Sequence, residues 1–254
     1  MNLPLLRPPW TPPPGVGAAM SLRVGGVSDG PFTSLNLGVA VGDDPLAVAG
    51  NRARFAAALG ARPVWLRQVH GTQVLRLRDD TEDTPDTPAD AAWTSQPGVA
   101  CTVQVADCLP VLFALRDGTA VAAAHAGWRG LAGGVLQATV QALCEGTGAR
   151  AADVQAWLGP CIGPRQFEVG ADVLRAFGQA PQTADARRFN YRARADGTPG
   201  WLANLLQLAH DSLAVAGVHA VSDAGACTVE DPSAFFSFRR DGRTGRMAAA
   251  IWRL

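Results

Sequence analysis

Two apolar runs joined by a turn place the strongest constraint on the fold of this chain. VLFAL (111–115) and TAVAAA (119–124) flank Arg-Asp-Gly at 116–118, a composition typical of a β-hairpin. The second run leads into His125, and Gly127 then ends the predicted strand. A buried strand that ends in an imidazole predicts a functional site at the open end of this hairpin.

The pairing of the two strands brings a cysteine close to this histidine. If Leu115 pairs with Thr119 across the turn, Cys108 falls almost opposite His125. Pro110 can bulge the strand, so the placement holds to about one residue. Facing side chains in such a pair have Cβ atoms about 5 Å apart, which suits two ligands of one metal ion.

A third ligand is available in QVHG, where His70 ends a predicted strand over 64–70 and a glycine again follows. Two imidazoles and a thiolate suit zinc, with the fourth position left for water or substrate. The predicted metal ligands are therefore His70, Cys108 and His125. Asp107 is a candidate to orient a ligand or to carry a proton.

Arginines follow the predicted metal site along the chain. Arg129 is either a surface residue stacked on Trp128 or an anion clamp beside the metal, since its planar fork suits phosphate. Leu131 is predicted to begin a helix whose free N–H groups point the same way. Arg239 and Arg240 in FFSFRR are candidates for anion binding and equally for salt bridges.

Strands and helices alternate along the chain, and several strands pair as hairpins. We therefore expect one α/β domain with mixed sheets over residues 1–254, beginning with a proline-rich segment over 1–15. Helices are predicted over 45–59, 131–144, 171–177 and 201–217, strands over 64–70, 73–77, 101–106, 154–159 and 246–254, and irregular segments over 25–38, 81–90 and 178–200.

Composition excludes several classes of protein. Basic and acidic residues are balanced at 22 each, so no net charge attracts nucleic acid or an acidic membrane, and the arginine-rich segment 186–197 is predicted to be a solvated loop. All basic residues are arginines, which excludes a Schiff-base lysine. Five cysteines without a CxxC spacing, and no secretory or membrane-spanning segment, predict a cytoplasmic protein with reduced thiols.

Two alternatives to a catalytic zinc site stay open at this point. In a metal-free hydrolase, Cys108 is the nucleophile and His125 its base, and His70 is not needed. In a structural zinc site a fourth protein ligand closes the coordination sphere, and Cys161 in a glycine loop is the best candidate.

A set of motifs in order, from about residue 16 to the C-terminus, resembles the YfiH family, also called the multicopper polyphenol oxidoreductase or laccase-domain family. The motifs are GGVS-GPF-SLNLG, RQVHGT, ADCLPVLF, HAGWRGLAGGV, LGPCIGP with FEVG, and a terminal CT…SFRR…GR. One departure is Phe238, where many relatives have His or Tyr before the paired arginines. It concerns a contact around the site rather than the metal ligands.

The resemblance implies a single domain of mixed β-sheets with helices outside, and one zinc ion on His70, Cys108 and His125. It also implies a purine nucleoside phosphorylase that cleaves adenosine, inosine or guanosine with phosphate. Adenosine deaminase and methylthioadenosine phosphorylase activities are expected beside it. In this hypothesis Arg129 holds negative charge and Asp107 carries a proton.

The laccase name implies copper, which the sequence does not favour. A multicopper oxidase needs more histidines than the four present, of which His210 and His219 are predicted to be structural or exposed. A blue-copper centre often has an axial methionine, and Met1, Met20 and Met247 are all remote from the ligands in sequence. Copper in the zinc site, with polyphenol oxidase activity, is the remaining alternative.

Overall fold

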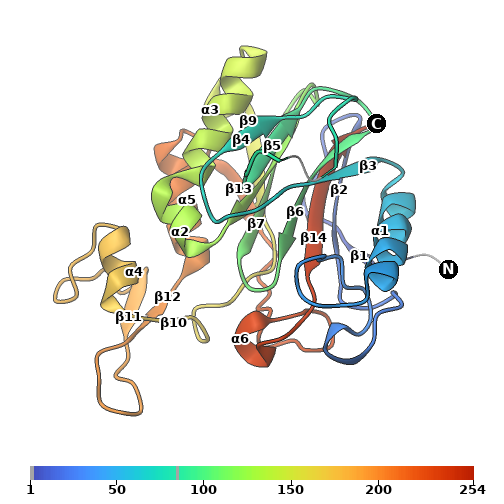
Figure 1. Cartoon of the computed structure of the whole chain (residues 1–254). Coiled ribbons are helices and arrows are strands. Elements are labelled where there is room, and N and C mark those ends of the chain that lie inside the picture. Colours follow the sequence, from blue (N-terminus) through green and yellow to red (C-terminus); the bar gives the residue numbers. More distant parts are fainter. Residues whose placement is uncertain (1–2, 84–85) are drawn as a thin grey trace.

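Two mixed β-sheets lie face to face, and helices cover their outer faces (Figure 1). The computed structural model describes residues 3–83 and 86–254. In spatial order, one sheet contains β13 (Ala220–Asp223), β9 (Val154–Leu158), β7 (Leu109–Leu115), β8 (Val121–Ala126), β5 (Ala91–Thr94) and β4 (Val74–Arg76). The other contains β1 (Leu5–Leu6), β2 (Val16–Ser21), β14 (Met247–Arg253), β6 (Val99–Val105) and β3 (Arg62–Trp65). Each combines parallel and antiparallel pairs, which confirms the predicted mixed α/β class.

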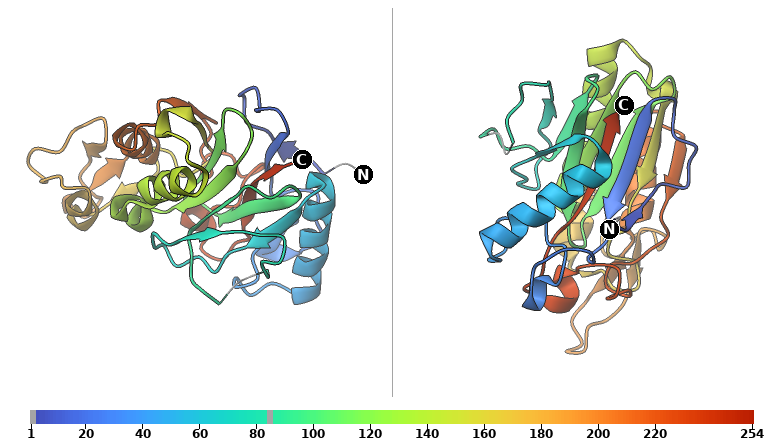
Figure 2. Two further views of the ribbon diagram at one scale, coloured as in Figure 1. Left: turned by 90° about the horizontal axis from the view of Figure 1, so that it is seen from above. Right: turned by 90° about the vertical axis from the view of Figure 1, so that its right-hand side faces the viewer.

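The helices divide between the two outer faces, as Figure 2 shows from above and from the side. Helix α1 (Pro45–Leu59) packs on the five-stranded sheet, whereas α2 (Trp128–Gly133), α3 (Val135–Thr147) and α5 (Leu205–Val215) pack on the six-stranded one. A small sheet of β10 (Glu168–Val169), β12 (Trp201–Ala203) and β11 (Phe189–Tyr191) lies to one side with α4 (Ala171–Ala176). The short α6 (Phe238–Asp241) and the 3₁₀ turns Gly30–Phe32 and Ala151–Asp153 complete the elements. Within the described residues, no helix has the length and apolarity that crossing a membrane requires.

Strand β7 is buried on both faces because it lies between a sheet and a helical layer. Val111, Phe113 and Leu115 pack toward α2, α3 and α5, while Leu112 and Ala114 pack against the other sheet. A strand buried on both sides loses the polar alternation of a half-exposed strand. This explains the unbroken apolar run VLFAL.

The hairpin forms, but its predicted register was wrong by one residue. Leu115 pairs with Ala120 rather than Thr119, through a hydrogen bond of 3.0 Å from the Leu115 N–H to the Ala120 carbonyl. Thr119 belongs to the turn, since its N–H and its hydroxyl both donate to the Asp117 carboxylate, at 3.0 and 2.7 Å. The side-chain bonds of the turn lengthen it by one position.

This shift places the two predicted ligands diagonally rather than opposite each other. Pro110 is the direct partner of His125, and Cys108 lies two residues before Pro110. Because side chains alternate along a strand, the direction of Cys108 matches that of Pro110 and His125. The site therefore survives a shift of register that moves the pairing by one residue.

Helix boundaries were predicted well where capping residues mark them. Asp44 caps α1 by accepting a hydrogen bond of 3.1 Å from Leu46 N, and Gly60 ends it in the left-handed conformation, with φ 67°. The predicted helix 131–144 is instead two helices, because Gly134 between α2 and α3 has φ 95°. The predicted helix 201–217 begins only at Leu205, after the cap Asn204 and the strand β12.

Three other segments differ from the prediction. The strand predicted over 64–70 ends at Trp65, and the segment 178–200 contains β11. The proline-rich N-terminal segment holds β1, although its first two residues lie outside the described part of the chain, as do residues 84–85 of the predicted loop 81–90.

Candidate metal centre

The side chains of His70, Cys108 and His125 converge at one point. Each offers a ligand atom, and these atoms lie within 4.8 Å of one another. The Cys108 Sγ is 3.7 Å from His70 Nε2, and the two imidazole rings are nearly perpendicular with centroids 4.8 Å apart. Sulfur and nitrogen ligands of a tetrahedral zinc ion are about 3.6 Å apart, given Zn–S of about 2.3 Å and Zn–N of about 2.05 Å. The donor set therefore fits one metal ion.

Burial of the three ligands is graded, so the centre opens to solvent on one side. His125 in β8 is buried, Cys108 immediately before β7 is partly buried, and His70 is exposed. His70 lies in a loop five residues beyond β3 rather than at the end of a strand, which corrects the prediction. An open side next to His70 is the arrangement that a substrate requires and that a closed structural site lacks.

Unusual backbone conformations concentrate at this centre. In the described chain, the only non-glycine residues with positive φ are His70, at 61°, and Asp107, at 89°. One is a predicted metal ligand and the other directly precedes Cys108. Such conformations are maintained only where surrounding contacts fix them, and they are common at functional sites.

Asp90 provides those contacts for His70. Its carboxylate accepts hydrogen bonds from the backbone N–H groups of Val69, His70 and Gly71, at 3.0, 2.9 and 2.7 Å. The side chain of Asp90 is fully buried. These bonds satisfy backbone donors of the loop after β3, where the prediction had extended the strand to residue 70.

Asp90 also orients the buried histidine of the centre. Its Oδ1 is 2.8 Å from His125 Nδ1. Burial opposes ionisation of Asp90, but bonds from His125, Gly71 and Val69 outweigh it and lower its pKa. An ionised carboxylate can only accept, so Nδ1 carries the proton and Nε2 is left for a metal ion.

Sequence reasoning missed Asp90, which it had placed in the acidic surface loop 81–90. Four acidic residues lie within ten positions there, and nothing in the sequence separates this one from the others. Its partners are 19 to 21 and 35 residues away, so only the folded chain reveals the role.

The Cys108 thiol is strongly biased toward the thiolate. Burial opposes its ionisation, but His125 and His70 outweigh burial and lower its pKa to about 6. Burial likewise opposes protonation of His125, but the Cys108 charge and Asp90 raise its pKa to about 9. Without a metal ion the two side chains therefore form an ion pair, and the thiolate is the form that binds zinc.

Gly127 leaves room for the converging side chains. A Cβ atom at this position would lie 2.7 Å from Cδ2 of His70 and 3.0 Å from Sγ of Cys108. Its backbone, with φ −65° and ψ 158°, is open to any residue. Glycine is thus required here by the space that the ligands occupy and not by the backbone.

Asp107 is buried in a network of hydrogen bonds. Its Oδ1 accepts from the Thr228 hydroxyl and its Oδ2 from the Arg239 N–H, both at 2.6 Å. Its carbonyl accepts from the Ile162 N–H at 2.9 Å. These bonds fix the residue that precedes Cys108, and three chain segments that are remote in sequence contribute to them.

The first of the predicted anion-binding groups, Arg129 and the helix start that follows it, lies on the surface in part and is bonded internally in part. Arg129 is exposed, and its guanidinium lies 4.4 Å from the centre of the Trp128 ring. The helix α2 begins at Trp128, and the Leu131 N–H donates to the Gly127 carbonyl, so the expected free donor at Leu131 was wrong.

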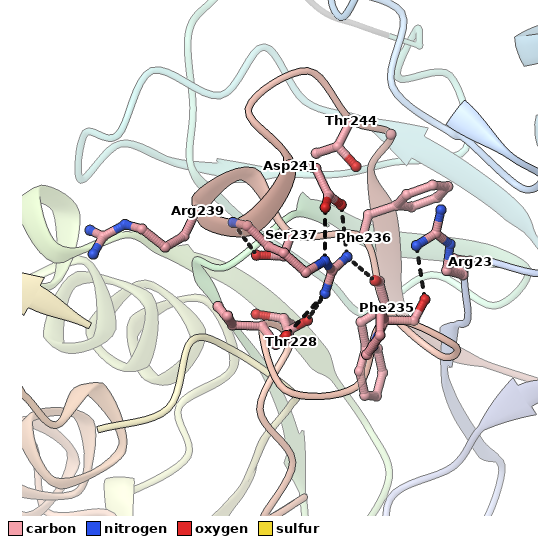
Figure 3. Close-up of polar contacts among 12 residues, drawn as sticks. Arg23, Thr228, Phe235, Phe236, Ser237, Arg239, Asp241 and Thr244 are labelled. Atoms are coloured by element: carbon pink, nitrogen blue, oxygen red, sulfur yellow. Dashed lines mark hydrogen bonds and ion pairs between the residues drawn. The ribbon is translucent and has the colours of Figure 1, made fainter. Parts of the chain in front are cut away.

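The paired arginines of α6 have internal partners. Arg240 donates to the Asp241 carboxylate and to the carbonyls of Thr228, Val229 and Phe235, a cluster shown in Figure 3. The guanidinium of Arg239 donates to two backbone carbonyls, at 3.3 and 3.2 Å. Arg240 therefore holds the C-terminal segment together rather than facing the metal centre.

Arg246 is a cation near the centre that sequence reasoning did not single out. Burial lowers its pKa, and the negative charges of Cys108 and Asp107 act against that shift. Its guanidinium donates to the carbonyls of Thr244 and Gly245, and no carboxylate of the described residues pairs with it. It is thus a partly buried positive charge close to Cys108 and Asp107.

The other predicted ligands lie outside the group. Cys161 is not a member of it, and its thiol donates to the Ile162 carbonyl. His210 pairs with Asp223 at 3.7 Å, and His219 is exposed. Met20 and Met247 are fully buried, and Met1 lies outside the described residues.

Replacing Gly127 with alanine is expected to disrupt the centre without unfolding the chain. The added methyl group would displace His70 or Cys108, because both lie closer than van der Waals contact. Zinc content after gel filtration, measured by atomic absorption, should fall strongly. Gly50→Ala is the matched control, since its methyl group meets only ordinary contact at 3.7 Å. Equal zinc content in the two variants would contradict this assignment.

Replacing Asp90 with asparagine is expected to weaken zinc binding about 10- to 100-fold, the usual effect of losing a carboxylate that orients a histidine ligand. The amide keeps the shape but can no longer accept every bond from the His70 loop and from His125. Competition with a chromophoric chelator measures the affinity. Unchanged affinity in a folded variant would show that the Asp90–His125 bond does not support the ligand.

Comparison with known proteins places this chain in a family. The family model for multi-copper polyphenol oxidoreductase laccase matches residues 17–254. A purine nucleoside phosphorylase of Pseudomonas aeruginosa is 48% identical over 247 residues, covering 97% of each chain. The purine nucleoside phosphorylase YfiH of Escherichia coli is 47% identical over 250 residues, covering 98% of each.

Solved structures agree with the sequence comparison. A crystal structure of a Neisseria meningitidis protein superposes with a TM-score of 0.88 at 45% identity and covers 98% of both chains. YlmD from Geobacillus stearothermophilus superposes with a TM-score of 0.86 at 32% identity, covering 98% of this chain and 96% of its own. The chain therefore belongs to the multi-copper polyphenol oxidoreductase laccase family, the family of the YfiH proteins.

Proposed function

We propose that this protein is a zinc-dependent purine nucleoside phosphorylase. It cleaves adenosine, inosine or guanosine with phosphate to the free base and ribose 1-phosphate. The observation that carries the proposal is the open His70–Cys108–His125 group, in a chain 47–48% identical to purine nucleoside phosphorylases over nearly its whole length.

Zinc is the metal that the donor set favours. Two imidazole nitrogens and one thiolate, with an open fourth position, are typical of catalytic zinc sites. His70, Cys108 and His125 would hold the ion, and Asp90 would keep His125 in the binding tautomer. When bound, zinc supplies a Lewis acid that polarises a substrate oxygen. Copper at the same ligands, with polyphenol oxidase activity, is the less favoured alternative.

The residues around the metal supply the other requirements of phosphorolysis. Phosphate must be held in line with C1′ of the ribose, and the purine must gain a proton as it leaves. Arg246, which has no carboxylate partner among the described residues, and the exposed Arg129, in the segment that follows His125, would hold the phosphate. Asp107 would carry the proton, because a carboxylate that accepts two bonds still has unused lone pairs.

Adenosine deaminase and methylthioadenosine phosphorylase side activities belong to the same proposal. Both would act on purine nucleosides in the same pocket. We also infer a cytoplasmic location for a single-domain enzyme, since all five cysteines are free thiols, the state that a reducing compartment maintains.

The competing function is a metal-free cysteine hydrolase. The ion pair of Cys108 and His125 would activate a nucleophile as readily as it would bind a metal. The position of His70 distinguishes the two functions. A Cys–His pair does not require a second imidazole, whereas a zinc site with an open position does.

Hypoxanthine release from inosine tests the proposal. The zinc-loaded protein should release the base only with phosphate present, and His70→Ala should lose both the activity and the zinc. His219→Ala, an exposed histidine, is the matched control and should keep both. Release that is independent of phosphate and survives in His70→Ala would favour the hydrolase instead. Absence of release from folded, zinc-loaded protein would exclude inosine phosphorolysis.

Arg246→Gln is expected to raise the KM for phosphate about tenfold, equal to about 1.4 kcal/mol for one charge-assisted contact. The KM for inosine should change little, because the guanidinium would contact phosphate alone. Arg129→Gln, measured in parallel, shows whether the exposed arginine contributes to the same contact. An unchanged phosphate KM in Arg246→Gln would remove it from the anion site.

A further inference from the structure

Two cysteines outside the metal group lie side by side. Cys161 follows β9 and Cys227 follows β13, and these strands are parallel neighbours in the six-stranded sheet. The two segments that follow these strands remain adjacent, and Cys161 and Cys227 form an isolated parallel bridge between them. Directly paired residues of neighbouring strands have Cα atoms about 4.8 Å apart, within the range of about 4.4–6.8 Å found for disulfides.

The side chain of Cys227 lies against the segment that carries Cys161. Its Sγ accepts a hydrogen bond of 3.1 Å from the Gly163 N–H. A Cβ atom on Gly163 would lie 3.1 Å from both Cβ and Sγ of Cys227. Residues paired directly across neighbouring segments project their side chains to the same side, and Cys161 and Cys227 are such a pair. Both sulfurs are therefore on one side of the paired chains.

The two thiols differ in exposure. Cys227 is partly exposed, whereas Cys161 is 1% exposed and belongs to the apolar core. Burial raises the pKa of the Cys161 thiol. A small oxidant in solution therefore reaches Cys227 first, and Cys161 is in place to react with the product. A solvent-accessible thiol next to a resolving thiol is a common arrangement in redox-sensitive proteins.

The residue after each cysteine holds Asp107. Ile162 donates its N–H to the Asp107 carbonyl at 2.9 Å, and the Thr228 hydroxyl donates to its Oδ1 at 2.6 Å. The Thr228 N–H also donates to the Cys161 carbonyl at 3.0 Å. Asp107 precedes Cys108 in the chain, so a change in the spacing of the cysteine pair reaches a metal ligand through two short paths.

We propose that Cys161 and Cys227 are a redox-sensitive pair that hydroperoxides convert into a disulfide, and that this disulfide weakens metal binding at Cys108. Neither the disulfide nor its effect on metal binding depends on the proposed phosphorylase activity. Only an effect of oxidation on catalysis rests on the proposed function.

The chemistry requires two steps and one equivalent of hydroperoxide. The Cys227 sulfur attacks the peroxide, an S–O bond forms, the O–O bond breaks, and the departing oxygen leaves as water or alcohol after protonation. The Cys161 sulfur then attacks the sulfenic acid, the S–S bond forms, and water leaves with the Cys161 proton. Two thiols lose two electrons in total, and the peroxide gains them.

Peptide mapping after hydrogen peroxide treatment tests the pair directly. The zinc-loaded protein should give a linked peptide containing Cys161 and Cys227 that thiol reductants separate. Zinc affinity, measured by competition with a chromophoric chelator, should fall about tenfold on oxidation, as for loss of a group that supports a ligand. It should recover after reduction.

Two variants separate this pair from oxidation of other thiols. Cys227→Ala should form no linked peptide and keep its zinc affinity after peroxide. Cys144→Ala, which removes another partly exposed thiol, should behave like the wild type. Oxidation of Cys227 to sulfinic acid with Cys161 still a thiol would overturn the pairing. A linked peptide with unchanged zinc affinity would overturn the coupling to the centre. Absence of phosphorolysis in every sample would count against the proposed function alone.

Discussion

The carboxylate of Asp90 is the contact on which the metal centre depends. It bonds to three successive backbone N–H groups around His70 and to the ring of His125, so one buried side chain positions two of the three ligands. A buried charge is tolerated only when its hydrogen bonds are satisfied, and Asp90 meets that condition through four partners. The left-handed backbone of His70, unfavourable for a residue with a Cβ atom, is maintained by the same bonds. The positions of His70 and His125 thus depend on the hydrogen bonds that the ionised Asp90 carboxylate accepts.

The two sheets provide a rigid support for the other residues of the metal centre. Strands β7 and β8 are buried on both faces, and their ladder fixes His125 and the end of the connecting segment that carries Cys108. Asp107 is held by groups from the segments after β9 and β13 and from α6. Strain at Asp107 is thereby distributed over hydrogen bonds from three parts of the chain, each anchored in a sheet or helix.

The features of the fold that could be predicted from the sequence are those that residues close together in the chain determine. The hairpin, the helix 45–59 with its Asp44 and Gly60 caps, and the mixed α/β class followed from patterns within a few residues. The register was wrong because the side chain of Asp117 captures Thr119 within the turn, a bond that periodicity does not show. Helix 201–217 was predicted too long because Trp201 to Ala203 pair with β10 and β11, which lie elsewhere in the chain. The role of Asp90 arises only from contacts between distant segments, and the role proposed for Arg246 rests on its nearness to Cys108 and Asp107, so no local pattern could indicate either.

The origin of the ligands gives the metal a mechanical role as well. His70 lies in the loop that leaves the five-stranded sheet, whereas His125 belongs to the six-stranded sheet, and Cys108 lies on the connection from β6 in one sheet to β7 in the other. A bound ion is therefore a cross-link between the two halves of the sandwich. Ligand binding to the native state alone stabilises it by about 2.7 kcal/mol at a free concentration of 100 times Kd. The concentration of free metal and the free energy needed to separate the two sheets are consequently linked. A substitution that loosens the packing between the sheets therefore lowers metal affinity even when every ligand is intact.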